Sequence, residues 1–157
     1  MARDDAVLAF AVSAGQLAYM MLEAGQPTRW HLWRIVGGDA PLARHRARVV
    51  IAETAPDLVV IEDPFNGCLK RGQSYAILLS LAQAVEDEPV RSARIRRTSP
   101  YVNRYEEAQA LCDRFPLLSP WRPEKPFFYE PEPRALLIFD ALALAVAVFD
   151  APESLAP

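Results

Sequence analysis

Glu62 and Asp63 are the acidic residues whose position in this sequence best suits chemistry. They follow Leu58-Val59-Val60-Ile61, a short apolar run rich in β-branched residues, and Pro64 comes directly after them. This pattern predicts a strand that is buried on both faces of a sheet. In open α/β sheets, ligands bind outside the carboxyl ends of the strands. The two carboxylates therefore mark either a functional site or only the point where the strand meets solvent.

Asp140 is the second acid that stands out, because it is alone in the apolar run from Leu136 to Val148. A carboxylate that is buried without a partner costs several kcal/mol. We therefore expect Asp140 either to face a polar site or to be protonated. The surrounding segment, Arg134 to Phe149, is apolar on nearly all sides, which predicts a largely buried helix.

The elements that must position these acids begin with an antiparallel meander of three strands. The third strand is expected to be half-buried, since large apolar and polar side chains alternate along it. The three predicted ranges are Ala6–Ser13, Gln16–Glu23 and Thr28–Ile35. On the third strand, Trp30 and Leu32 share one face, and Arg29, His31 and Trp33 share the other.

Helical patterns separate the later strands. Asp39 is suited to cap a helix that carries Pro41 in its first turn. We expect this helix to run from about Pro41 to Ala55 with Leu42, Val49, Val50 and Ile51 inward. The pattern then predicts a helix over Gln73–Glu86, a strand over Val90–Arg97, and a helix that starts at Thr98-Ser99-Pro100 and ends near Arg114.

Basic residues gather after two of the predicted strands. Lys70 and Arg71 lie in the loop that follows Phe65, and the range Val90–Arg97 is the most basic part of the chain. These cations either contact phosphate groups or discourage edge pairing on a solvated edge strand. The arginines of that strand are Arg91, Arg94, Arg96 and Arg97.

A proline-rich segment, residues 116–133, precedes the last predicted helix. Its prolines prevent a regular helix or an internal strand. Aromatic residues are interleaved with them, which is unusual in a disordered linker. We therefore expect an ordered loop packed on its own domain, where it would cover the final helix, or on a partner. The aromatic residues are Trp121, Phe127, Phe128 and Tyr129.

Length and composition set broad limits on the class of protein. The 157 residues are 52% hydrophobic and 24% charged, as expected for a single globular domain over 1–157. The net charge of −3 argues against a strongly basic nucleic-acid binder, although a local basic face remains compatible with it. Cys68 and Cys112 match no metal-binding spacing, so we expect a reduced, cytoplasmic protein. No apolar run is long enough for a membrane span.

The predicted order β-β-β-α-β-α-β-α-α is that of the ribonuclease H-like fold, an α/β fold with a mixed sheet flanked by helices. More specific residues resemble the RuvC-type Holliday junction resolvases. Val60-Ile61-Glu62 is followed by Phe65, and Gly72-Gln73 opens the next helix after Lys70. The sequence Asp140-Ala141-Leu142-Ala143 resembles the C-terminal helix of that family.

The resemblance implies a metal-dependent endonuclease with four acidic positions and Mg²⁺ or Mn²⁺ as cofactor if active. Such enzymes hold two metal ions between converging carboxylates. Glu62 and Asp140 fill two of the positions, whereas Ala11 and Leu137 stand at the other two. Asp63 could join the site only if the strand has ended before it, since adjacent strand residues face opposite ways. These departures predict a degenerate site with impaired catalysis.

Three hypotheses follow. In the first, the protein binds branched or duplex DNA without cleaving it, and Lys70, Arg71, Arg94, Arg96 and Arg97 contact phosphates. In the second, it is an active resolvase that uses Glu62, Asp140 and Asp63, with Glu62 and Asp140 as metal ligands. In the third, it binds a protein partner through Trp121–Tyr129. The resemblance also implies a homodimer.

Overall fold

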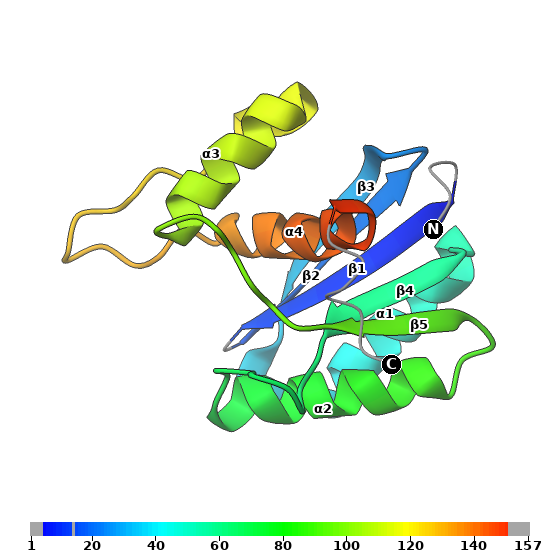
Figure 1. Ribbon diagram of the computed structural model, residues 1–157. Coiled ribbons are helices and arrows are strands. Elements are labelled where there is room, and N and C mark those ends of the chain that lie inside the picture. The colour runs from blue at the N-terminus through cyan, green and yellow to red at the C-terminus, as the bar shows by residue number, and fades with distance from the viewer. Residues whose placement is uncertain (1–4, 14, 151–157) are drawn as a thin grey trace.

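The computed structural model describes residues 5–13 and 15–150, and its centre is a five-stranded sheet in the order β3-β2-β1-β4-β5 (Figure 1). The first three strands pair antiparallel, and β4 and β5 pair parallel to β1 and β4. Val7 pairs with Leu58 and Ala9 with Val60, so β1 and β4 are parallel neighbours. The strands are β1 (Ala6–Ser13), β2 (Gln16–Glu23), β3 (Gln26–Arg34), β4 (Leu58–Glu62) and β5 (Arg91–Ile95).

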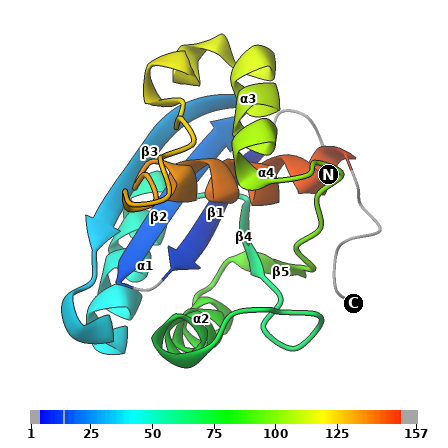
Figure 2. The same ribbon diagram turned by 90° about the vertical axis from the view of Figure 1, so that its left-hand side faces the viewer.

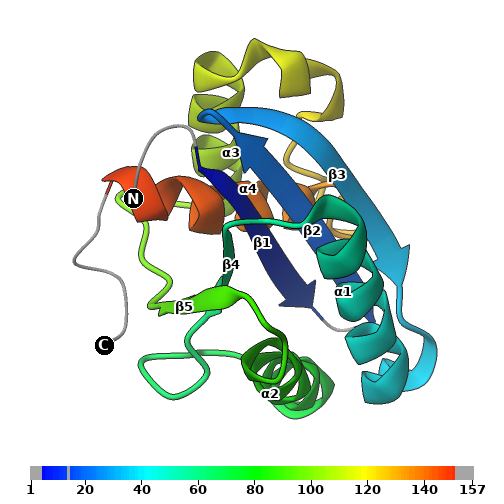
Figure 3. The same cartoon turned by 90° about the vertical axis from the view of Figure 1, so that its right-hand side faces the viewer.

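Helices cover both faces of this sheet. Figure 3 shows α1 (Ala40–Thr54) and α2 (Gly72–Glu86) on one face, and Figure 2 shows α4 (Leu136–Asp150) crossing the other. The helix α3 (Arg104–Arg114) packs on α4. Two 3₁₀ helices complete the structure, η1 (Val36–Gly38) and η2 (Pro116–Trp121).

Side-chain alternation along the strands divides the core into two layers. On β1, Leu8 and Phe10 belong to the layer under α1 and α2, whereas Ala9 and Ala11 belong to the layer under α4. Because successive strand residues face opposite sides of a sheet, β4 follows the same rule. Val60 lies on the α4 side, so Glu62, two residues later, also faces α4.

The apolar character of α4 follows from its position between the sheet and α3. Eleven of its residues are buried, which confirms the predicted buried helix. Asp140 is half-buried and interrupts this apolar surface at one end of the sheet.

Three local predictions need correction. The helix predicted to start at Thr98-Ser99-Pro100 begins at Arg104, because Asn103 accepts hydrogen bonds from the first free backbone N–H groups of α3. Val49 is 39% exposed, whereas Val50 and Ile51 are buried as predicted. The strand predicted over Val90–Arg97 ends at Ile95, and Arg96 and Arg97 continue past its pairing with β4. The cap formed by Asp39 is confirmed.

The proline-rich segment divides into two parts with different environments. Trp121, at the end of η2, packs edge-on against Trp30 of β3 with ring centroids 5.2 Å apart. Phe127, Phe128 and Tyr129 are 68%, 100% and 72% exposed. The expectation that these rings cover the final helix is therefore wrong for residues 127–129.

No helix within residues 5–13 and 15–150 is long and apolar enough to cross a membrane. The residues beyond Asp150, which the single-domain prediction includes, lie outside the described part of the chain.

Candidate functional site

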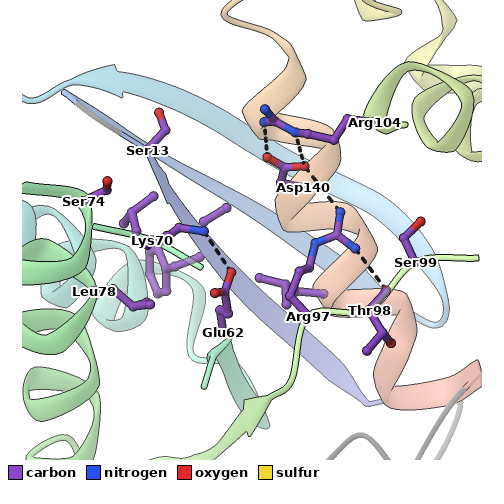
Figure 4. A pocket seen from close by; sticks show the side chains of 14 residues that line it. Ser13, Glu62, Lys70, Ser74, Leu78, Arg97, Thr98, Ser99, Arg104 and Asp140 are labelled. Atoms are coloured by element: carbon purple, nitrogen blue, oxygen red, sulfur yellow. Dashed lines mark hydrogen bonds and ion pairs between the residues drawn. The ribbon is translucent and has the colours of Figure 1, made fainter. Parts of the chain in front are cut away.

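The carboxyl ends of β1 and β4 open into a pocket of about 410 Å³ whose far wall is α4 (Figure 4). Apolar residues form part of the lining, and charged groups and hydroxyls converge on it. The apolar residues are Phe10, Ala11, Val12, Leu78 and Leu144. The polar residues are Ser13, Glu62, Lys70, Ser74, Arg97, Thr98, Ser99, Arg104 and Asp140.

Glu62, the last residue of β4, is bound to a lysine of its own chain. The residue is only 6% exposed, and Lys70 Nζ lies 2.8 Å from its Oε1. Lys70 comes from the loop between β4 and α2. Burial and a hydrogen bond with Glu62 raise the pKa of the nearby Cys68 thiol. Glu62 therefore has its negative charge matched within the protein.

Asp140 is held by two arginines from the same chain. Arg104 donates from Nε to Oδ1 at 3.2 Å and from Nη2 to Oδ2, which is a bidentate pair. Arg97 Nη2 lies 3.4 Å from Oδ1. Burial alone would lower the pKa of Arg104, but Asp140 and then Glu132 outweigh it and raise that pKa. The prediction that Asp140 faces a polar site agrees with these contacts.

Glu107 is an acid of this network that the sequence reasoning missed. It is 5% exposed on α3 and accepts hydrogen bonds from both terminal nitrogens of Arg97. Burial tends to lower the pKa of Arg97, but Glu107 and Asp140 raise it overall. A signal was available, because Glu107 lies on the same helical stripe as Leu111 and a buried acid requires a partner.

Asp63 takes a different role from Glu62. Its backbone N–H donates to the carbonyl of Ile95, so strand-like pairing continues past the end of β4. Its side chain accepts from the backbone N–H of Phe65, which fixes the turn after the strand. Asp63 is not among the residues that line the pocket. The structure therefore brings Glu62 and Asp140 to one pocket and leaves Asp63 in a turn.

The predicted basic residues also separate into two groups. Arg97 lines the pocket, whereas Arg94 stacks over the Phe65 ring at 5.4 Å. Arg96 lies against Gly67, where an added Cβ would be 3.0 Å from its Nε. Lys70 lines the pocket beside Glu62, and the exposed Arg71 precedes α2. Alternation along β5 explains why Arg94 faces away from α4, since Ala93 and Ile95 on either side of it belong to the layer under α4.

The donor set of the pocket does not fit a two-metal centre. Its lining contains two carboxylates and three cations, a formal sum of +1. Ala11 and Leu137, at the other two acidic positions implied by the resemblance, lie in the apolar layer under α4. Within residues 5–13 and 15–150, no group of three His, Cys, Asp or Glu side chains is placed to hold a metal ion.

Comparisons with solved structures find the same fold in proteins of low sequence identity. Thermus thermophilus RuvC superposes with a TM-score of 0.62 at 12% identity, over 96% of this chain and 99% of that one. Fowlpox virus resolvase, solved with Holliday junction DNA, superposes with a TM-score of 0.60 at 10% identity, over 94% of this chain and 98% of that one. The Mn-soaked terminase nuclease domain of human cytomegalovirus superposes with a TM-score of 0.52 at 11% identity, over 95% of this chain and 84% of that one.

No protein-family model and no curated protein sequence matches the chain. The structural matches therefore establish the fold. The chain has the RuvC-like form of the ribonuclease H-like fold, with the mixed sheet flanked by helices that the sequence predicted.

Proposed function

We propose that this protein binds nucleic acid, in particular branched DNA, at the pocket face and does not cleave it efficiently. One observation carries the proposal: both carboxylates that line the pocket, Glu62 and Asp140, form ion pairs with cations of the same chain. The nuclease-like fold supports a nucleic-acid ligand, and the paired acids support loss of cleavage.

Impaired cleavage follows from the charge that a two-metal mechanism requires. Two divalent cations need converging carboxylates to hold them, and together they stabilise the attacking and leaving oxygens. In this pocket Lys70, Arg97 and Arg104 already neutralise the acids. A metal ion would have to displace these cations and leave them close to its own positive charge.

The polar lining of the same pocket offers donors to a phosphate group. Three cations and four hydroxyls border it. Glu107 and Glu132 also pair with the two arginines, so the whole network has a formal sum of −1 and a phosphate would have to compete with these acids. Phosphate contacts of this kind position a nucleic acid without reading its sequence. Outside the pocket, Arg71, Arg94 and Arg96 extend the set of cations available to the backbone. Two of the solved structures with this fold, Thermus thermophilus RuvC and fowlpox virus resolvase, were determined with Holliday junction DNA.

The experiment is a combined binding and cleavage assay on a labelled four-way DNA junction. Wild-type protein is incubated with the junction in Mg²⁺, in Mn²⁺ and in EDTA, and samples are run on native and denaturing gels. We expect retardation of the junction in all three buffers and intact strands throughout.

The Glu62→Gln variant is the control for residual catalysis. Cleavage by the wild-type protein that this variant abolishes would establish the alternative, an active metal-dependent resolvase. Absence of retardation in every buffer would reject the DNA-binding proposal itself.

The homodimer, the protein partner at Trp121–Tyr129 and the cytoplasmic location stay predictions. Light scattering of the purified protein measures the first of these directly.

A further inference from the structure

The turn at residues 126–131 presents three aromatic rings to solvent; we call Phe127, Phe128 and Tyr129 the aromatic tip. The Phe127 and Tyr129 rings lie nearly parallel, with an interplanar angle of 6° and centroids 5.7 Å apart. Phe128 stands edge-on to Tyr129 and is fully exposed. Large aromatic side chains stabilise a fold mainly when they are buried. The exposed rings of the tip therefore contribute little to the stability of their own chain.

Hydrogen bonds and prolines around the tip fix the conformation of its turn. Glu130 donates its N–H to the carbonyl of Phe127 at 2.9 Å, and its side chain accepts from the N–H of Phe127 at 3.2 Å. Pro126 and Pro131 flank the turn, and their fixed φ angles limit its alternatives. A segment restricted in this way loses less conformational entropy when a ligand covers it.

The root of the tip is anchored at the rim of the pocket. Glu132 accepts a hydrogen bond of 2.7 Å from Arg104, and the same guanidinium holds Asp140 inside the pocket. Figure 1 shows the loop that carries the tip extending outward from the start of α4. A nucleic acid that contacts Arg104 would therefore meet the base of this loop, at Glu132.

We propose that the aromatic tip stacks on nucleobases of the nucleic acid bound at the pocket face. The proposal rests on the proposed function. Exposed aromatic faces stack on bases of any sequence, with about 1–3 kcal/mol per base. Base faces are accessible where strands are unpaired, as in single-stranded gaps and at branch points. The segment 124–134 carries Glu124, Glu130 and Glu132 against Lys125 and Arg134, a formal sum of −1, so the tip contributes ring faces whereas the pocket contributes cations.

The test compares two DNA substrates and two variants. One substrate is a continuous duplex, and the other carries a short unpaired gap with 2-aminopurine, whose fluorescence falls when it is stacked. The tip variant replaces Phe127, Phe128 and Tyr129 with alanine. The matched control is Leu117→Ala, because Leu117 is an exposed apolar residue of η2 outside the tip.

We expect the wild-type protein to quench the 2-aminopurine signal on binding, and the tip variant to lose this quenching. Affinity of the tip variant for the gapped substrate should fall about tenfold or more, the equivalent of one lost stacking contact. Affinity for the continuous duplex should change little. Leu117→Ala should behave as wild type on both substrates, and thermal unfolding should show that all variants are folded.

Other outcomes overturn the proposal at distinguishable levels. If the wild-type protein binds neither substrate, the proposed function fails and the stacking role fails with it. If it binds and the tip variant binds both substrates equally well with the same quenching, only the stacking role fails. If DNA affinity is unchanged but the oligomeric mass of the tip variant falls, the rings form a protein interface instead.

Discussion

The pocket and the aromatic tip differ in how far the chain satisfies its own groups. In the pocket, Glu62 and Asp140 are matched by lysine and arginine side chains of the same protein. At the tip, three rings extend into solvent and contact one another, with no other ring partner among the described residues. Arg104 connects the two regions through Asp140 and Glu132.

This difference separates a structural role from a binding role. A buried charge that has found its partner contributes to the fold, and removing one partner is costly. An exposed apolar group contributes little to the fold and gains most when a ligand buries it. The paired acids of the pocket thus behave as parts of the structure, and the unsatisfied rings are the better candidates for recognition.

The largest expected effect is the loss of stability when Arg97 is replaced and its ion pair with Glu107 is broken. The Arg97→Ala variant leaves Glu107, 5% exposed, without its main partner, and breaking such a buried pair costs about 3–5 kcal/mol. Urea denaturation measures this loss. The matched control is Arg91→Ala, an exposed arginine at the start of β5, which should stay within about 0.5 kcal/mol of wild type.

A double variant sharpens this prediction. Replacing Glu107 with Gln in the Arg97→Ala background removes the unpaired charge, so part of the lost stability should return. A single Arg97→Ala variant as stable as wild type would contradict the structural role assigned to this network.

The next effect concerns the cations outside the matched network. Arg94 and Arg96 do not contact the pocket acids, so they are free to bind phosphate without breaking the fold. Replacing both with alanine should flatten the dependence of log K on log salt by about 0.9 for each lost contact. Measurement of affinity for duplex DNA over a range of salt tests this. Arg48→Ala, on α1, is the control and should leave the slope unchanged. An unchanged slope in the double variant would remove Arg94 and Arg96 from the interface.

The smallest expected effect is a change in the alkylation rate of Cys68, whose thiol lies near Glu62. Burial and Glu62 raise the pKa of Cys68, which lowers its thiolate fraction at a given pH. Glu62→Gln removes the negative charge and leaves Lys70 nearby, so the pKa should fall and alkylation near pH 8 should become faster. The measurement uses Cys112→Ser protein so that only Cys68 reacts. Glu86→Gln, an exposed acid on α2, should not alter the rate; a Glu62→Gln rate equal to wild type would show that Glu62 does not control the thiol.

The sequence predicted the parts of this site that depend on local pattern. Glu62 was found because a buried apolar strand ends at it, and Asp140 because an isolated acid in a buried helix needs a polar environment. Strand alternation explains why Glu62 enters the pocket and Asp63 does not. The element order predicted the sheet, since each strand carried its own apolar signature.

The partners of these acids depend on contacts that no local pattern encodes. Arg97 meets Glu107 and Asp140 only after β5, α3 and α4 have packed, and Asp140 lies 43 positions further along the chain. The start of α3 was misplaced for a related reason. Ser99 and Pro100 are a suitable helix start by composition, but Asn103 provides the cap that the structure uses. Whether the aromatic rings face inward or outward was likewise set by tertiary packing.

The central claim is that the chain's own cations neutralise the pocket acids. A Mn²⁺ titration tests it most directly, with the free ion measured by electron paramagnetic resonance. This measurement needs no substrate and no catalytic activity. We expect wild-type protein and Glu62→Gln to leave the same amount of free Mn²⁺, because Lys70, Arg97 and Arg104 already neutralise the acids. Stoichiometric uptake of Mn²⁺ by the wild-type protein, lost in Glu62→Gln, would contradict the claim.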